Sequence, residues 1–256
     1  MRAIWKGWLS FGLINIPVFL YSGTKAKELS FHLLHHKDLS PIRFARICVK
    51  DGHEIPWEEV VKGYEFTKGH MVVLTDEDFE KVNIKRVKSI EMLDFADEEE
   101  IDTIYYEKPY LLEPQKGAAK AYILLREALK RSKKVGVCKF VLRNREHLGV
   151  IKSSGDFLIL NQLRFPNELV QHTSLQIPKG EKVTKQELDI AMKLIDQLST
   201  HFNPKHYKDE YTEELLALIQ KKSKGKKVAK KGKEPQQTKE TDFMKALRAS
   251  LKKKAA

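Results

Sequence analysis

Short runs in which apolar and polar residues alternate dominate the first half of the chain. The first run, residues 8–21, carries Leu9, Phe11 and Leu13 at alternate positions and then shifts register at Ile14. Alternation with a period of two is typical of a half-buried β-strand, so we expect one bent strand here. Further runs of the same kind are bounded by turn-forming residues or acidic loops and cover 69–75, 87–95 and 104–112. Short strands spaced in this way predict a β-barrel or a β-sandwich.

The hydrophobic period changes after Gly117. Tyr122, Leu125 and Leu129 are spaced i, i+3 and i+7 in a segment rich in alanine and leucine, which predicts an amphipathic helix. The cations that follow suit the partial negative charge of a helix C-terminus. Alternation then returns in two runs, which predict strands over 135–143 and 156–165.

Helical patterns take over from residue 184. Thr184 and Glu187 have the spacing of a capping box, in which each side chain accepts a hydrogen bond from the other residue's backbone. An apolar stripe follows and consists of Leu188, Ala191, Met192, Ile195 and Leu198. Pro204 interrupts the helical pattern, and residues 209–222 predict another helix. Such stripes are more often packing surfaces than cofactor sites.

Net charge is concentrated at the end of the chain. Lys and Arg number 47 against 35 Asp and Glu, a formal charge of +12, of which residues 219–256 carry +11. Within the remainder, residues 76–113 carry −8 and residues 116–152 carry +9. Two positive segments in one chain favour a polyanionic partner, either nucleic acid or an anionic membrane surface.

The end of the chain has little apolar content over residues 221–233, so we expect this tail to be disordered. Residues 241–251 show near-helical apolar spacing with cations between. That segment could fold on a partner or a phosphate backbone; the alternative is a frayed, solvated end, because about 12 residues is marginal for an isolated helix.

Composition excludes several classes of protein. Cys48 and Cys138 are the two cysteines, too few for a disulfide scaffold or a four-cysteine zinc site, and they favour a reducing cytoplasm. No apolar run approaches the roughly 18 residues of a membrane-spanning helix, so we expect no membrane partner of that kind. Phosphate-loop, dinucleotide and nucleophile-elbow motifs are absent.

Two groups of residues resemble metal ligands without completing a site. His32, His35 and His36 have i, i+3, i+4 spacing but lack an acidic or cysteine partner at a familiar distance. Cys48 and His53 supply two ligands where a zinc knuckle needs four. The acidic run at 97–102 is interpreted as a solvated loop, since contiguous carboxylates point in different directions. We therefore expect no catalytic residues, no metal and no cofactor, and nucleic-acid binding is the favoured function.

Ordered motifs along the chain resemble those of the bacterial Ku proteins. The resemblance covers about residues 1–222 and rests on the opening MRAIWKG at 1–7, SFGLINIPV at 10–18, VKGYE at 61–65, VLTDED at 73–78, KAY and LLREAL within 120–129, FVLR at 140–143 and DEY at 209–211. It implies a mixed β/α, mainly β fold: a Ku-core β-barrel with a bridge over residues 1–182, a helical region over 183–222 and a flexible basic tail over 223–256.

The resemblance also implies a function. Ku proteins form a homodimeric ring that encircles a double-stranded DNA end without reading its sequence and recruits the end-joining DNA ligase in non-homologous end joining, on the nucleoid in the cytoplasm. Paired cysteines occur near the bridge of some members. Here Asp51 stands three positions after Cys48, so a zinc site is not implied.

A ring that slides on any sequence must contact phosphates, which calls for Lys and Arg. We expect such contacts from the bridge, from the helix end with its following strands, and from the tail: Arg43, Arg46, Lys50, Lys62 and Lys68; Lys130, Arg131, Lys133, Lys134, Arg143, Arg145 and Lys152; and Lys226, Lys227, Lys230 and Lys231.

Two alternatives stay open at this point. A basic nuclease or other metal-dependent DNA-processing enzyme would need clustered carboxylates around a divalent ion. A scaffold at a membrane surface would rely on the basic tail but lacks hydrophobic anchoring.

Overall fold

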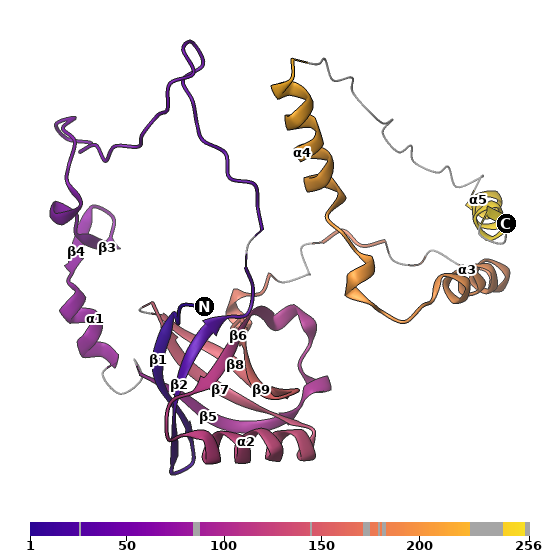
Figure 1. The fold of residues 1–256 in the computed structure, drawn as a ribbon, viewed down its shortest axis with the longest axis horizontal. Coiled ribbons are helices and arrows are strands. Elements are labelled where there is room, and N and C mark those ends of the chain that lie inside the picture. The colour runs from indigo at the N-terminus through magenta and orange to yellow at the C-terminus, as the bar shows by residue number, and fades with distance from the viewer. Residues whose placement is uncertain are drawn as a thin grey trace. The chain divides into compact units, whose positions relative to one another are not determined.

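The computed structural model describes residues 1–25, 27–83, 88–143, 145–170, 175–178, 180, 183–225 and 243–253. The chain divides into two compact units (Figure 1). One unit comprises Met1–Lys27 with Phe31–His172, and the other comprises Glu28–Ser30 with Thr173–Ala256.

The first unit is built on a closed β-barrel. Its strands are β1 (Trp5–Phe11), β2 (Ile14–Ser22), β5 (Ser89–Asp97), β6 (Tyr106–Pro114), β7 (Lys134–Leu142), β8 (Arg145–Ser154) and β9 (Phe157–Leu163), paired in the order β1-β2-β6-β9-β8-β7-β5. Neighbouring strands run antiparallel except β1 and β5, which close the barrel in parallel with Leu9 opposite Ile90. The mainly β class is confirmed, and the barrel is the correct one of the two predicted architectures.

The first predicted strand is wrong in one respect. Residues 8–21 form a hairpin, not one bent strand, with Phe11 of β1 opposite Ile14 of β2. Gly12 has φ of +56°, a conformation that glycine adopts without steric cost, and Leu13 at the turn is fully exposed. The register shift in the sequence therefore marks a tight turn.

Sequence patterns also missed some elements. Strand β8 was not expected, nor was β3 (Lys62–Thr67) or helix α1 (Asp76–Asn83). The short 3-10 turns η1 (Trp57–Glu59), η2 (Glu98–Glu100), η3 (Thr103–Tyr105), η4 (Pro166–Glu168) and η6 (Pro204–His206) complete the connections.

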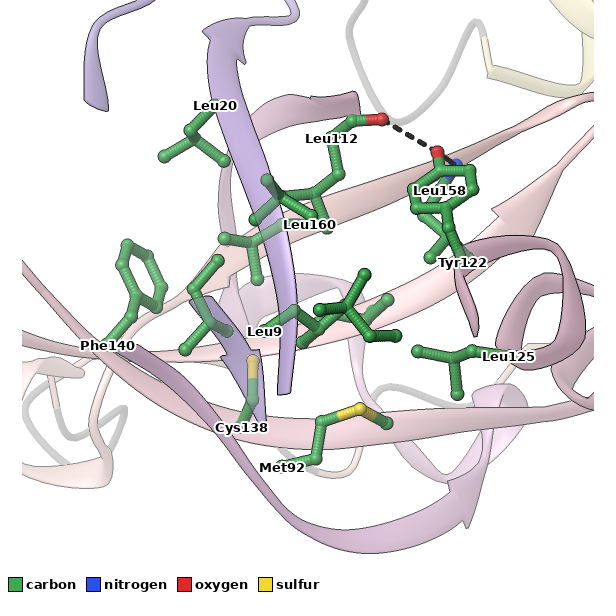
Figure 2. Packing of buried hydrophobic residues seen from close by; sticks show 14 of the residues in the cluster. Leu9, Leu20, Met92, Leu112, Tyr122, Leu125, Cys138, Phe140, Leu158 and Leu160 are labelled. Carbon is green, nitrogen blue, oxygen red and sulfur yellow. Dashed lines mark hydrogen bonds between the residues drawn. The ribbon is translucent and has the colours of Figure 1, made fainter. Parts of the chain in front are cut away.

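Helix α2 (Ala119–Ser132) packs against the barrel core. The predicted spacing is confirmed, since Tyr122, Leu125 and Leu129 are the buried residues of this helix. The Tyr122 hydroxyl donates to the carbonyl oxygen of Leu112 at 2.7 Å and accepts from the backbone N–H of Leu158 at 2.7 Å (Figure 2). One hydroxyl thus connects α2 to β6 and β9.

The barrel interior is filled by side chains from alternate strand positions. Leu9, Ile90, Cys138, Ile151 and Leu160 are all fully shielded from solvent. Figure 2 shows Cys138 among leucine and aromatic side chains, and this burial raises the pKa of its thiol. Closure of the barrel leaves no exposed sheet edge among these strands.

A long extended segment, residues 31–74, lies between β2 and α1, and we call it the arm (Figure 1). It contains η1, β3 and β4 (His70–Leu74), with β3 and β4 paired as an antiparallel hairpin around Gly69, whose φ is +83°. From residue 31 to 73 every side chain is exposed apart from Cys48 and Ile55, which are half-buried. The arm therefore has no core of its own.

Helices make up the regular structure of the second unit: α3 (Lys185–Leu198), α4 (Glu210–Ser223) and α5 (Phe243–Lys253). The predicted capping box is confirmed, because the Glu187 N–H donates to Thr184 Oγ1 at 3.3 Å and the Thr184 N–H donates to Glu187 Oε2 at 2.7 Å. Helices α3 and α5 pack against each other. Across the described ranges, no helix has the length and apolar character needed to cross a membrane.

Candidate nucleic-acid interface

Four of the expected DNA-binding lysines converge on one concavity of the barrel. Lys130 comes from α2, Lys133 caps that helix, Lys134 begins β7 and Lys152 lies on β8. Together with Glu98, Leu129, Val135 and Ser153 they line a cavity of about 220 Å³. Lys133 ends α2 in the left-handed conformation, φ 57°, and the strand that follows at once carries Lys134 into the cluster.

Two carboxylates compensate part of this positive charge. Lys134 Nζ donates to Asp97 Oδ2 at 2.7 Å, and Lys152 forms an ion pair with Glu98. These acids belong to the run expected as a solvated loop; the structure instead places them at the end of β5 and in η2, against the lysines. In the part of the chain that the structure describes, Lys130 and Lys133 form no ion pair.

Two further cations expected to bind DNA, Arg143 and Arg145, lie elsewhere on the barrel. Arg143, with φ of 53°, and Arg145 lie at the turn between β7 and β8, at the end of β7 opposite Lys134. At about 3.3 Å per strand residue, roughly 30 Å separates the two ends. Arg145 pairs with Glu168, whose pKa is lowered by the Phe165 N–H and, less strongly, by Arg145. The expected DNA-binding cations of residues 130–152 thus fall into two groups, one at each end of β7. Arg131 lies with Lys130 in the last turn of α2.

Three of the five expected arm cations have a local partner, and each partner is different. Arg43 pairs with Glu54 at 3.4 Å, and Lys62 pairs with Asp76 at 3.1 Å. Arg46 stacks over the Trp57 ring at 5.3 Å from its centroid. Lys50 and Lys68 are also exposed, and neither forms an ion pair with any described residue. The tail lysines Lys226, Lys227, Lys230 and Lys231 fall outside the described residues.

The arm also exposes apolar side chains that sequence patterns had not singled out. Large aromatic and aliphatic residues are solvent-exposed along its length, including Phe31, Phe44, Val49, Trp57, Tyr64, Phe66 and Met71. Phe44 is 85% exposed and Phe66 is 75% exposed. The available signal was apolar content without a clear helix or strand period over residues 31–66. Large apolar side chains exposed in such number over one segment favour a protein–protein contact.

The residues considered as metal ligands make local contacts. His35 Nδ1 lies 2.8 Å from Asp38 Oδ1. Asp51 accepts from the His53 N–H at 3.1 Å, a bond that lowers the pKa of Asp51. Across the described ranges, no group of three or more His, Cys, Asp or Glu side chains is arranged to hold a metal ion.

A larger cavity, about 670 Å³, lies beside β2, β6 and α2. Its polar side chains are paired with one another or with backbone. Tyr21 donates to Glu113, and Arg126 bonds both Glu127 and the carbonyl oxygen of Asp156. These groups stabilise the cavity wall.

Fold and surface together define a closed β-barrel protein that carries an extended arm and clustered exposed cations. Residues 10–190 match the family model described as Ku, the Ku70/Ku80 beta-barrel domain. The chain belongs to the Ku family.

Similar proteins span most of the chain. A protein of Opitutus terrae is 42% identical over 100% of this chain and 93% of its own length. One from Archaeoglobus fulgidus is 41% identical over 89% of this chain and 90% of its own length. One from Frankia casuarinae is 40% identical over 98% of this chain, which spans 63% of that relative. Each is named non-homologous end joining protein Ku.

Proposed function

We propose that this protein binds double-stranded DNA ends without reading their sequence, as a homodimeric ring that threads onto the end, and that it recruits and stimulates the end-joining ligase during repair of double-strand breaks. Membership of the Ku family supports the end-joining role. In this role the protein works in the cytoplasm, on the nucleoid. Its core spans residues 1–182, its helical region 183–222 and its basic tail 223–256.

The exposed arm is the observation that best supports a dimeric ring. A two-stranded hairpin such as β3–β4 is at best marginally stable alone in water, and this one exposes Tyr64 and Phe66. A second copy offers the same apolar surface, and pairing of identical patches produces a closed two-fold dimer. Two arms joined in this way, each continuous with its barrel, enclose an opening between the subunits.

Cations along that opening would bind the phosphate backbone. Lys130 and Lys133 carry no local ion pair among the described residues, so a phosphate need not displace a carboxylate to reach them. Each phosphate contact releases condensed counterions, and the logarithm of affinity falls with the logarithm of salt at about −0.9 per contact. Many contacts in a dimer therefore give tight binding that weakens steeply with salt and does not depend on base sequence.

Blocking the DNA ends tests this function directly. We expect the protein to bind a short open-ended duplex at least about tenfold more tightly than the same duplex closed by hairpin loops, because a ring reaches the helix only through an end. Gel-shift titrations at about 50 and 200 mM salt measure both the difference and its salt dependence. Equal binding to both duplexes would contradict threading. Degradation of the open duplex with Mg²⁺ or Mn²⁺ would instead support the nuclease alternative.

The lysine cluster allows a sharper test of the phosphate contacts. Glu98→Gln removes the partner of Lys152 and is expected to raise affinity for the open-ended duplex about threefold and to steepen the salt dependence by up to about one contact. The gel-shift titration measures both.

Glu99→Gln is the matched control, since it changes the net charge equally at the next residue of η2. Similar gains in the two variants would mean that only long-range charge matters and that the cluster does not touch DNA.

A ligase-facing surface is proposed in the helical region. The apolar stripe of α3 leaves Leu188, Met192 and Ile195 at least half exposed. An amphipathic partner helix buries side chains at this spacing.

A further inference from the structure

Helix α3 has two adjacent apolar arcs in different environments. Ile190, Ala191 and Leu194 are partly buried. The stripe expected from the sequence is therefore divided: its member Ala191 belongs to the partly buried arc, whereas Leu188, Met192, Ile195 and Leu198 are 48–58% exposed. At 100° per residue the two arcs adjoin, so apolar side chains cover more than half of the helix circumference. A helix of this kind has room for more than one helical neighbour.

We place helix α5 on the first arc, because Gln197 of α3, which bonds α5, lies next to Ile190 and Leu194 on the helix circumference. Among the α5 side chains that the structure describes, Met244, Leu247 and Leu251, spaced i, i+3 and i+7, are partly buried, whereas Lys245 and Arg248 are exposed. The two helices pack together, and Gln197 Nε2 of α3 donates to the carbonyl oxygen of Leu251 at 3.4 Å. The segment that the sequence left open as a partner-binding helix or a frayed end thus packs on its own chain.

Neither helix is long enough to be stable alone. Helix α3 has 14 residues and α5 has 11, and isolated helices below about 12–15 residues are marginal in water. Mutual burial of the two apolar faces therefore stabilises both helices. Loss of α5 from α3 would expose one continuous apolar surface over both arcs.

We propose that α5 is an internal latch: a cationic amphipathic helix that occupies one arc of α3 and withholds it from partner helices of the same pattern. A competing helix must carry apolar residues at i, i+3 and i+7 with cations beside them, as α5 does. The second arc stays open to a partner while the latch is closed. Displacement of α5 extends the docking surface to the whole apolar circumference.

Disrupting the α5 face in the full-length protein tests the latch. Leu247→Asp with Leu251→Asp removes the apolar contact, and hydrogen exchange of α3 amides 187–197 is expected to become at least about tenfold faster. A labelled peptide with the sequence of residues 241–254 is expected to bind this variant at least about tenfold more tightly than the unaltered protein, because the arc is then vacant.

Ala246→Asp with Ala249→Asp is the matched control. It adds the same charge on the opposite face of α5 and costs at least as much intrinsic helix propensity. We expect it to behave as the unaltered protein does in both measurements. Equal α3 exchange in the three proteins, or no preference of the peptide for the Leu247→Asp, Leu251→Asp variant, overturns the latch.

Discussion

Replacing Phe44 and Phe66 by aspartate should convert the proposed homodimer to a monomer and weaken its binding to open duplex ends by at least about a hundredfold, close to 2.7 kcal/mol. Both rings are largely exposed on the arm of the single chain. If the arm pairs with a second copy, each ring is buried twice by symmetry, once in each subunit. A charged side chain at such a buried position costs several kcal/mol. In the proposed ring, loss of the second arm leaves the duplex open on one side.

Light scattering after size-exclusion chromatography measures the oligomeric state of this variant, and gel shifts measure its DNA affinity. Ala45→Asp with Thr67→Asp is the control, because it places the same negative charge at neighbouring exposed positions without removing an aromatic ring. The thermal unfolding temperature of the barrel should be unchanged in both variants, since neither alters a buried residue. If the Phe44→Asp, Phe66→Asp variant remained dimeric, the arm would not form the dimer interface.

Tyr122→Phe should lower the free energy of unfolding of the barrel by about 2–4 kcal/mol. The substitution preserves the ring and removes one hydroxyl. That hydroxyl accepts from the Leu158 N–H and donates to the Leu112 carbonyl oxygen inside the core. Both backbone groups would lose this bond while Leu112 and Leu158 are at most 2% exposed, and each buried unsatisfied group costs about 1–3 kcal/mol. Equilibrium urea unfolding followed by circular dichroism measures the change.

Leu124→Ala provides the comparison for this prediction. It lies on the same helix with its side chain 61% exposed, so its replacement should cost no more than about 0.5 kcal/mol. If Tyr122→Phe costs as little as Leu124→Ala, then α2 is not held to β6 and β9 through this hydroxyl. DNA binding by Tyr122→Phe should be normal at temperatures where the barrel stays folded, because Tyr122 is buried.

Local patterns in the sequence predicted much of the fold. The spacing of Tyr122, Leu125 and Leu129 predicted both a helix and its buried face. The capping box at Thr184 and Glu187 located the start of α3. Each signal depends on residues within a few positions of one another, where helix period and backbone hydrogen bonding determine the result. Strand alternation similarly indicated a mainly β protein.

Two errors show where such local information ends. One alternating run over residues 8–21 was interpreted as a bent strand, but β1 and β2 pair with each other across a turn at Gly12. Strand β8 was missed although it lies between β7 and β9 in the barrel. Alternation shows which residues share a face but not which strand lies beside them.

For the candidate site, too, some features were predictable from the sequence and others were not. Composition and local charge counts identified the basic segments, because net charge follows from sequence alone. The strand predicted over 135–143 already implied that Lys134 and Arg143 lie at opposite ends of it, but only the tertiary structure brought Asp97 to Lys134, 37 residues away. It likewise left Phe44 exposed and folded α5 onto α3. Periodicity, caps and charge are local properties, whereas strand partners, ion pairs and exposure depend on which distant segments the packed core brings together.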